Sequence, residues 1–180
     1  MDGLPSLFVG AGELVVRNEE GQILRVEPLD TSVLTPVLAP DGSRVAYVRR
    51  NGGTSFGIRV RRLPGLELVR DINVGSAGSW PRSLAFTPDS RRLLLTTTHP
   101  LAAADTNNFS DVYLVGVEDD SVDWVSSGIA GEVPRGHSDQ PSISRDGRVV
   151  AFRSWAPNVA LGAAAESSQV MVRDFSSGLT

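Results

Sequence analysis

Short apolar runs rich in Val, Leu and Ile recur along the chain, and polar or turn-forming residues separate them. Within the runs, apolar positions alternate with polar ones or form brief continuous stretches, which is typical of half-buried and buried β-strands. The sequence contains 18 Gly and 11 Pro, so helix-breaking residues occur too often for long helices. The Ala-rich stretch 160–166 has an internal glycine and is predicted to be a loop with at most one helical turn. The pattern predicts an all-β protein.

One hairpin pattern, a short strand followed by a tight turn and a more apolar strand, occurs three times. Its copies are Pro36–Tyr47, Ser83–Leu95 and Gln140–Ser154. Asp closes such turns through its side chain and Gly adopts positive φ readily, so the turn markers are Asp41, Gly42, Asp89, Asp146 and Gly147. Copies spaced by roughly 50 residues, with four strands in each period, are the sequence signature of β-propeller blades.

The predicted strands group into a single partial β-propeller of about three and a half blades, made of four-stranded antiparallel sheets. The expected division is the end of a blade at 6–28, complete blades at 33–75 and 80–127, and an incomplete blade at 140–180. The individual strands are expected at Ser6–Gly10, Glu13–Arg17, Gln22–Glu27, Pro36–Ala39, Arg44–Arg49, Gly57–Arg62, Leu66–Val74, Ser83–Phe86, Arg92–Thr97, Asp111–Val117, Val122–Ser126, Pro141–Ser144, Val149–Ser154 and Gln169–Asp174.

The turn before Val-Ala-Tyr or Val-Ala-Phe, with its Asp-Gly and following Arg, resembles the WD-like repeat of TolB-like β-propellers. The segments Asp105–Leu114, Ser142–Asn158 and Val170–Gly178 are similar to bacterial multi-blade proteins built from such repeats. The resemblance covers about residues 33–180 and implies the propeller fold. It implies no single function, because such blades occur in binding proteins, assembly platforms and accessory domains of peptidases.

Completeness of the ring is the next question, because propellers typically have four to eight blades. The strand count favours a fragment or an assembling half-propeller over a complete closed ring. An open propeller leaves sheet edges unpaired, and unpaired edges associate with other strands. We therefore expect a protein partner, or self-association through the unpaired blade edges.

Composition and charge exclude several kinds of chemistry. The net charge is −4, and the 17 positive residues are all Arg, so lysine Schiff-base chemistry is impossible. With no Cys, there is no thiolate catalysis and no Cys-based zinc site. Dispersed Arg on a slightly acidic chain predicts no nucleic-acid partner. No signal peptide and no membrane span are recognised, which predicts a cytoplasmic location, or a periplasmic or secreted one if the chain belongs to a longer protein.

Catalytic candidates are few. Gly53–Gly57 matches the G-x-S-x-G pattern, but the pattern needs a helix after the serine and here a second strand is expected. His99 and His137 are both expected in loops, with no spacing to a second ligand. His137 precedes the first strand of its blade, so it could line a binding site at the central channel. The acidic run Glu118–Asp120 is predicted to be a solvated turn.

A calcium site is predicted at Asp105, Asn107 and Asp111, with Ser110 or a backbone carbonyl assisting. Hard cations such as Ca²⁺ bind several oxygen ligands from closely spaced carboxylates and amides. The alternative is that these Asp and Asn side chains cap turns by hydrogen bonding to the backbone. No other cofactor is predicted.

The sequence favours a non-catalytic, TolB-like binding or scaffold module for protein or ligand interaction. One alternative is an accessory propeller domain of a peptidase or hydrolase whose catalytic domain lies outside this sequence. A metal-dependent enzyme on a propeller is a further alternative, and it would require clustered His and acidic residues at one channel mouth.

Overall fold

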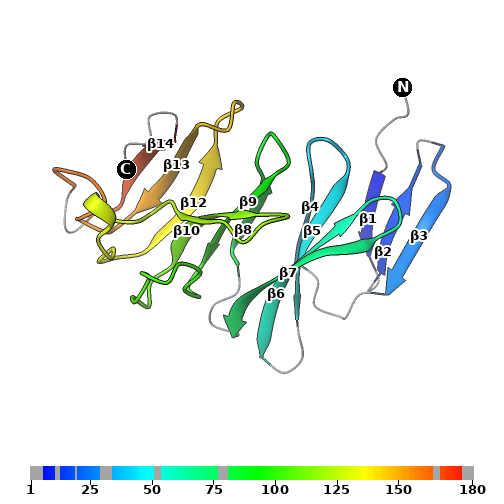
Figure 1. The fold of residues 1–180 in the computed structure, drawn as a ribbon, viewed down its shortest axis with the longest axis horizontal. Coiled ribbons are helices and arrows are strands. Elements are labelled where there is room, and N and C mark those ends of the chain that lie inside the picture. Colours follow the sequence, from blue (N-terminus) through cyan, green and yellow to red (C-terminus); the bar gives the residue numbers. More distant parts are fainter. Residues whose placement is uncertain are drawn as a thin grey trace.

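The computed structural model describes residues 6–10, 13–18, 20–28, 34–50, 54–76, 81–163 and 167–175. Its strands form four antiparallel sheets, which follow one another across the molecule in chain order (Figure 1). The first and last sheets lie at opposite ends of the view, so the described sheets form an open array (Figure 1). The predicted all-β fold of four-stranded antiparallel blades is confirmed. Within the described residues, no helix is long and apolar enough to cross a bilayer.

The sheets are named here by their order in the chain. Sheet 1 contains β1 (Ser6–Gly10), β2 (Glu13–Arg17) and β3 (Ile23–Pro28). Sheet 2 contains β4 (Leu34–Leu38), β5 (Arg44–Arg50), β6 (Ser55–Arg62) and β7 (Glu67–Ser76). Sheet 3 contains β8 (Ser83–Phe86), β9 (Arg92–Thr97), β10 (Asp111–Gly116) and β11 (Val122–Trp124). Sheet 4 contains β12 (Ser138–Ile143), β13 (Val149–Ser154) and β14 (Gln169–Asp174), and a 3₁₀ turn at Ile129–Gly131 precedes it.

Alternation along the strands holds the array together, because successive side chains of a β-strand point to opposite faces. Leu93 and Leu95 of β9 pack against sheet 2, whereas Leu94 between them packs against sheet 4. In the same way, Val45 and Tyr47 of β5 pack against sheet 1. Each pair of neighbouring sheets therefore encloses its own apolar layer, and the central strands of the two inner sheets are buried on both faces.

The Asp-Gly turns form as predicted. In each turn the Asp carboxylate accepts the backbone N–H two residues later, with oxygen–nitrogen distances of 2.9, 3.1 and 3.1 Å for Asp41, Asp89 and Asp146. Hydroxyl groups of Thr87 and Ser144 also donate to Asp89 and Asp146, and they lower the pKa of both carboxyls. These residues are structural turn markers.

The turn of sheet 3 differs from the other two because Ser90 occupies the glycine position. Gly42 and Gly147 have φ of 70° and 74°, and Ser90 has φ of 61° although it carries a side chain. The Ser90 side chain is buried, and its Oγ accepts the backbone N–H of Asp41 at 3.2 Å. A turn of one sheet is thus bonded directly to the turn of the preceding sheet.

In sheets 2, 3 and 4 the first strands lie next to one another, since β4 contacts β8 and β8 contacts β12. These first strands are called the inner strands.

The prediction placed the start of β12 at Pro141, and this was wrong: β12 begins at Ser138. A bulge between Asp139 and Ser142, with Gln140 at φ of 50°, interrupts the regular pairing. The alternation pattern could not reveal this start, because a bulge breaks the period of two.

Some predicted features lie outside the described residues: the turn 51–53, Trp80, part of the Ala-rich stretch (164–166) and residues 176–180.

The acidic run Glu118–Asp120 is an exposed turn, as predicted, and it also contacts the neighbouring sheet. Arg44 of sheet 2 donates to the Glu118 carboxylate. Arg70 of β7 donates to the carbonyl oxygen of Gly116 at 2.8 Å and to Asp120 at 2.9 Å. The turn therefore joins the outer parts of sheets 2 and 3, where the apolar layer ends.

We predict that Arg70→Met lowers the free energy of unfolding by about 1–2 kcal/mol, because it leaves the Gly116 carbonyl without its donor. Asp120→Asn removes only the fully exposed carboxylate charge and should leave stability nearly unchanged, since exposed ion pairs contribute little. Urea denaturation of both variants measures the difference. Equal losses in the two variants would contradict the dominant role of the carbonyl bond.

Candidate functional site

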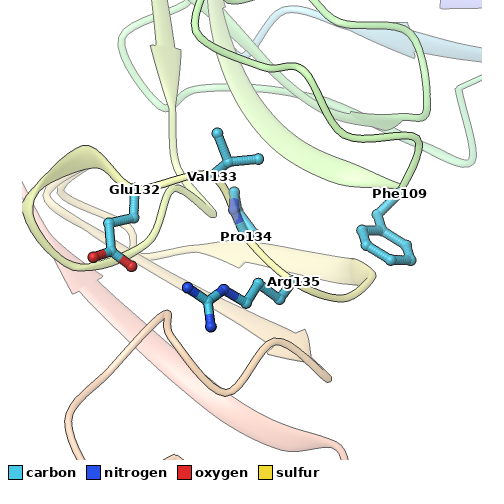
Figure 2. A pocket seen from close by; sticks show the side chains of 5 residues that line it. All are labelled: Phe109, Glu132, Val133, Pro134 and Arg135. Atoms are coloured by element: carbon cyan, nitrogen blue, oxygen red, sulfur yellow. The ribbon is translucent and has the colours of Figure 1, made fainter.

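Two adjoining hollows lie at the end of the molecule where β8, β10 and β12 begin. The first, with a volume of about 520 Å³, is lined by Phe109, Glu132, Val133, Pro134 and Arg135. Figure 2 shows Phe109 and Glu132 at opposite sides of it, with the Arg135 side chain extending from the Phe109 side toward Glu132. The second, called here the His137 hollow, has a volume of about 490 Å³ and is lined by Arg82, Thr98, Ser110, Arg135, Gly136, His137, Asp139 and Trp155. Volumes of this size are typical of small-ligand sites.

The loop that separates the two hollows is held by Asn158. Its Oδ1 accepts the backbone N–H of Arg135 at 3.1 Å, and its Nδ2 donates to the carbonyl oxygen of Val133 at 2.9 Å. Its own carbonyl accepts the N–H of Ile129 at 2.9 Å. Sequence reasoning gave Asn158 no role, because its partners lie more than twenty residues earlier in the chain.

Gly136 lets this loop approach the segment after β13. A Cβ atom at Gly136 would lie 2.9 Å from the backbone atoms of Trp155 and Ala156, which is too close for any other residue. The backbone N–H of Trp155 donates to the carbonyl oxygen of His137 at 2.9 Å. The glycine and this hydrogen bond together place Trp155 beside His137.

His137 has a defined tautomer. The backbone N–H of Ser110 donates to His137 Nδ1 at 2.9 Å, so Nδ1 is the acceptor and the neutral ring carries its proton on Nε2. The Phe109 ring meets the imidazole edge-on, with ring centroids 4.9 Å apart and an interplanar angle of 79°. The ring is therefore oriented, and its Nε2–H remains as a donor.

The Ser110 hydroxyl also lies near His137, as a hydrolase nucleophile would. Its Oγ is 3.2 Å from Nδ1, but it donates to the carbonyl oxygen of Ser138 at 3.1 Å, and the side chain is buried. The single lone pair of Nδ1 already accepts the Ser110 N–H. These contacts join the loop before β10 to the start of β12, and they are the contacts of a structural serine.

Asp139 is paired with an arginine of the next strand. Arg153 makes two parallel hydrogen bonds to its carboxylate, both 2.8 Å long. The same guanidinium lies 4.4 Å from the centroid of the Trp155 ring. Asp139 contributes little net negative charge to the His137 hollow, because Arg153 neutralises it.

The other catalytic candidates lie elsewhere. His99 lies against Gly75 of β7, so close that a Cβ on Gly75 would be 2.8 Å from His99 Nδ1. Ser55, the serine of the G-x-S-x-G pattern, is the first residue of strand β6, whereas a nucleophile elbow needs a helix there. Gly53 of this pattern lies outside the described residues.

The predicted calcium residues do come together, in a buried hydrogen-bond network. The Tyr113 hydroxyl donates to Asp105 Oδ2, and the backbone N–H of Asn107 donates to Asp105 Oδ1. Asn107 Nδ2 donates to Asp111 Oδ2 at 3.0 Å, and Ser126 Oγ donates to Asp111 Oδ1 at 2.5 Å. The carboxylate oxygens therefore accept hydrogen bonds from the protein itself.

This geometry favours the turn-capping alternative for Asp105 and Asn107. Among the described residues, no group of three or more His, Cys, Asp or Glu side chains is arranged to hold a metal ion. A calcium ion would have to displace the Tyr113 hydroxyl and the Asn107 amide from the carboxylates. Calcium binding stays a prediction, and an increase in melting temperature with added calcium would support it, because a ligand that binds the folded state stabilises it.

Burial perturbs two groups of the network. Burial raises the pKa of Asp111 to about 6, against the opposing effect of its hydrogen bonds with Ser126 and Asn107. Burial and the hydrogen bond to Asp105 raise the pKa of the Tyr113 hydroxyl above its ordinary value. At neutral pH Asp111 is therefore ionised, and the burial of its charge lowers the stability of the fold.

Solved β-propeller structures resemble this fold. TolB from Acinetobacter baumannii superposes with a TM-score of 0.55 and 20% identity over 92% of this chain and 36% of that chain. The β-propeller domain of the Trilobed protease from Pyrococcus furiosus, which has an open velcro topology, gives 0.55 and 16% over 96% and 52%. The tricorn protease gives 0.59 and 13% over 96% and 21%. The fold is that of a TolB-like β-propeller.

These comparisons establish the fold alone, because the identities are low. The chain spans about a third of the A. baumannii TolB chain and about half of the Trilobed protease propeller domain. No protein-family model and no curated protein matches the sequence.

We predict that the Asp111 carboxyl makes the protein less stable as pH rises. Its raised pKa means that its stabilising contribution is complete below the unfolded value of 3.8 and is lost as pH rises through about 6. Relative to Asp111→Asn, the wild-type free energy of unfolding should fall by roughly 2 kcal/mol between pH ~4.5 and pH ~7.5.

The matched control is Asp146→Asn, because the pKa of Asp146 is lowered by the Ser144 hydroxyl. The wild type should gain stability relative to this control as pH rises through the ordinary range of a carboxyl, which is the opposite sign. Denaturant melts from pH ~2.5 to pH ~7.5 measure both differences. If the difference in free energy of unfolding between the wild type and Asp111→Asn did not change with pH, burial would not perturb the pKa of this carboxyl.

Proposed function

We propose that the chain is a non-catalytic β-propeller module that binds a protein partner through the bare outer face of sheet 4, and that this partner is a second copy of the chain. The observation that supports the proposal is the exposure of strand β14. Val170 and Val172 are 77% and 67% exposed, whereas Met171 between them is 8% exposed and lies in the core. The two valines therefore form an apolar face on the side away from sheet 3.

The edge of β14 is also incomplete by comparison with the inner sheets. In sheets 2 and 3 a fourth strand, β7 or β11, pairs with the third. Within the described residues, β14 pairs only with β13. Beside Val170 and Val172 no further strand among the described residues pairs with β14, and such an edge accepts a further strand.

The opposite end of the array offers a matching surface. Ile23, Leu24 and Val26 of β3 are 57%, 47% and 41% exposed. Within the described residues, each pair of neighbouring sheets packs through an apolar layer, and there are three such layers. Contact between sheet 4 of one copy and sheet 1 of another copy would form a fourth layer of the same kind. This contact joins two different surfaces and is head-to-tail, which allows a ring or a longer assembly.

An accessory propeller domain of a hydrolase is the second candidate. It is favoured by the kinds of protein whose propellers this fold resembles, which include the tricorn and Trilobed proteases and a Pyrococcus horikoshii acylaminoacyl peptidase. The coding sequence that adjoins this one distinguishes the candidates. An adjoining α/β-hydrolase pattern would favour the accessory domain.

We predict that the protein self-associates in a concentration-dependent manner and that Val170→Lys with Val172→Lys converts it to a monomer, because lysine charges are costly to bury in an apolar layer between two sheets. The control is Leu68→Lys on β7, which is also an exposed outer strand (Leu68 is 54% exposed) but belongs to a complete sheet. Sedimentation velocity over a range of concentrations measures the mass. A wild-type monomer at all concentrations, or an equal effect of Leu68→Lys, would overturn the proposal.

A further inference from the structure

We propose that the His137 hollow binds a small organic anion, a phosphate or carboxylate group attached to a flat ring. The anionic group would be held by Arg82, Arg135 and the Nε2–H of His137, and the ring would pack on Trp155. The site lies at the start of the inner strands β8 and β12. Asp139 of the hollow pairs with Arg153, which in turn pairs with Val170, so the site adjoins the outer face of sheet 4.

The charge of the hollow is the first support. Arg82 and Arg135 both line it. The lining carboxylate of Asp139 is neutralised by its two bonds to Arg153. Glu132 faces Arg135 across the adjoining hollow (Figure 2), but it does not line the His137 hollow. Two arginines therefore border one cavity whose lining carboxylate is already paired. Arginine forks match the geometry of phosphate and carboxylate groups.

The His137 ring adds a directed donor. Since the Ser110 N–H occupies Nδ1 and Phe109 holds the ring edge-on, the ring cannot present its acceptor nitrogen to the hollow. The remaining polar group of this lining residue is Nε2–H, which suits an anion and does not suit a cation or a metal ion. The hydrogen bond between Trp155 N–H and His137 carbonyl keeps this donor next to the indole.

Trp155 supplies the apolar contact. Its ring lines the hollow, is 36% exposed, and is fixed from one side by the Arg153 guanidinium. A flat ring stacked on an indole gains area and favourable geometry together. With a volume of about 490 Å³, the hollow accommodates a ring and an anionic group at once.

Isothermal titration calorimetry at low salt tests the proposal with four probes: adenosine monophosphate, indole-3-acetate, inorganic phosphate and adenosine. We expect one or both of the ring-bearing anions to bind at least about tenfold more tightly than phosphate or adenosine, which each lack one half of the recognised chemistry. The relative affinity of the first two probes distinguishes a phosphate ligand from a carboxylate ligand. Binding should weaken with added salt.

Variants connect the binding to these side chains. Arg82→Gln and Arg135→Gln should each weaken the preferred anion about tenfold or more, and Trp155→Leu should remove the advantage over inorganic phosphate. The control is Arg145→Gln, an exposed arginine in the Asp146 turn, which should leave affinity unchanged. Circular dichroism melts confirm that each variant is folded. Failure of both ring-bearing anions to bind the wild type, or an affinity that Arg82→Gln and Arg135→Gln leave unchanged, would overturn the proposal.

Discussion

Apolar packing between the faces of successive sheets is the interaction on which the rest of this structure depends. A β-strand has two faces, and in the inner sheets both faces are used, so that Leu94 contacts one neighbour while Leu93 and Leu95 contact the other. Each sheet is thus stabilised by its neighbours as well as by its own hydrogen bonds. The ion pairs of Glu118 and Asp120, and the bond between Ser90 and the turn of the preceding sheet, add polar contacts between the sheets outside these layers.

Much of the fold could be predicted from the sequence because the information is local and repeated. Short continuous apolar runs mark strands such as Glu13–Arg17 and Arg92–Thr97, and Asp146 with Gly147 marks a turn whose φ favours glycine. The start of β12 could not be predicted, since the bulge near Gln140 breaks the alternation. The exposed turn at Glu118–Asp120 was predicted correctly, but its contacts with Arg44 and Arg70 were not, because these partners lie far away in the chain.

The candidate site was less predictable than the fold. The sequence placed His137 near the central channel, but its partners Ser110, Phe109 and Trp155 come from two other loops. It also grouped Asp105, Asn107 and Asp111 correctly in space, as expected for residues so close in the chain. Their hydrogen-bond partners, Tyr113 and Ser126, are what decide the chemistry of that cluster, and no local pattern indicated them.

Ser90 has a consequence for how the blades relate to one another. Repeats are usually exchangeable, since each makes the same contacts with its neighbours. Here the hydroxyl that bonds the backbone of Asp41 occurs in one turn and is replaced by glycine in the equivalent turns of the two adjacent sheets. The blade that carries Ser90 is therefore matched to the blade before it. Reordering the blades would separate Ser90 from the Asp41 backbone and lose this hydrogen bond, even where apolar packing between the sheets is kept. The buried Ser90 hydroxyl therefore favours one order of these two blades.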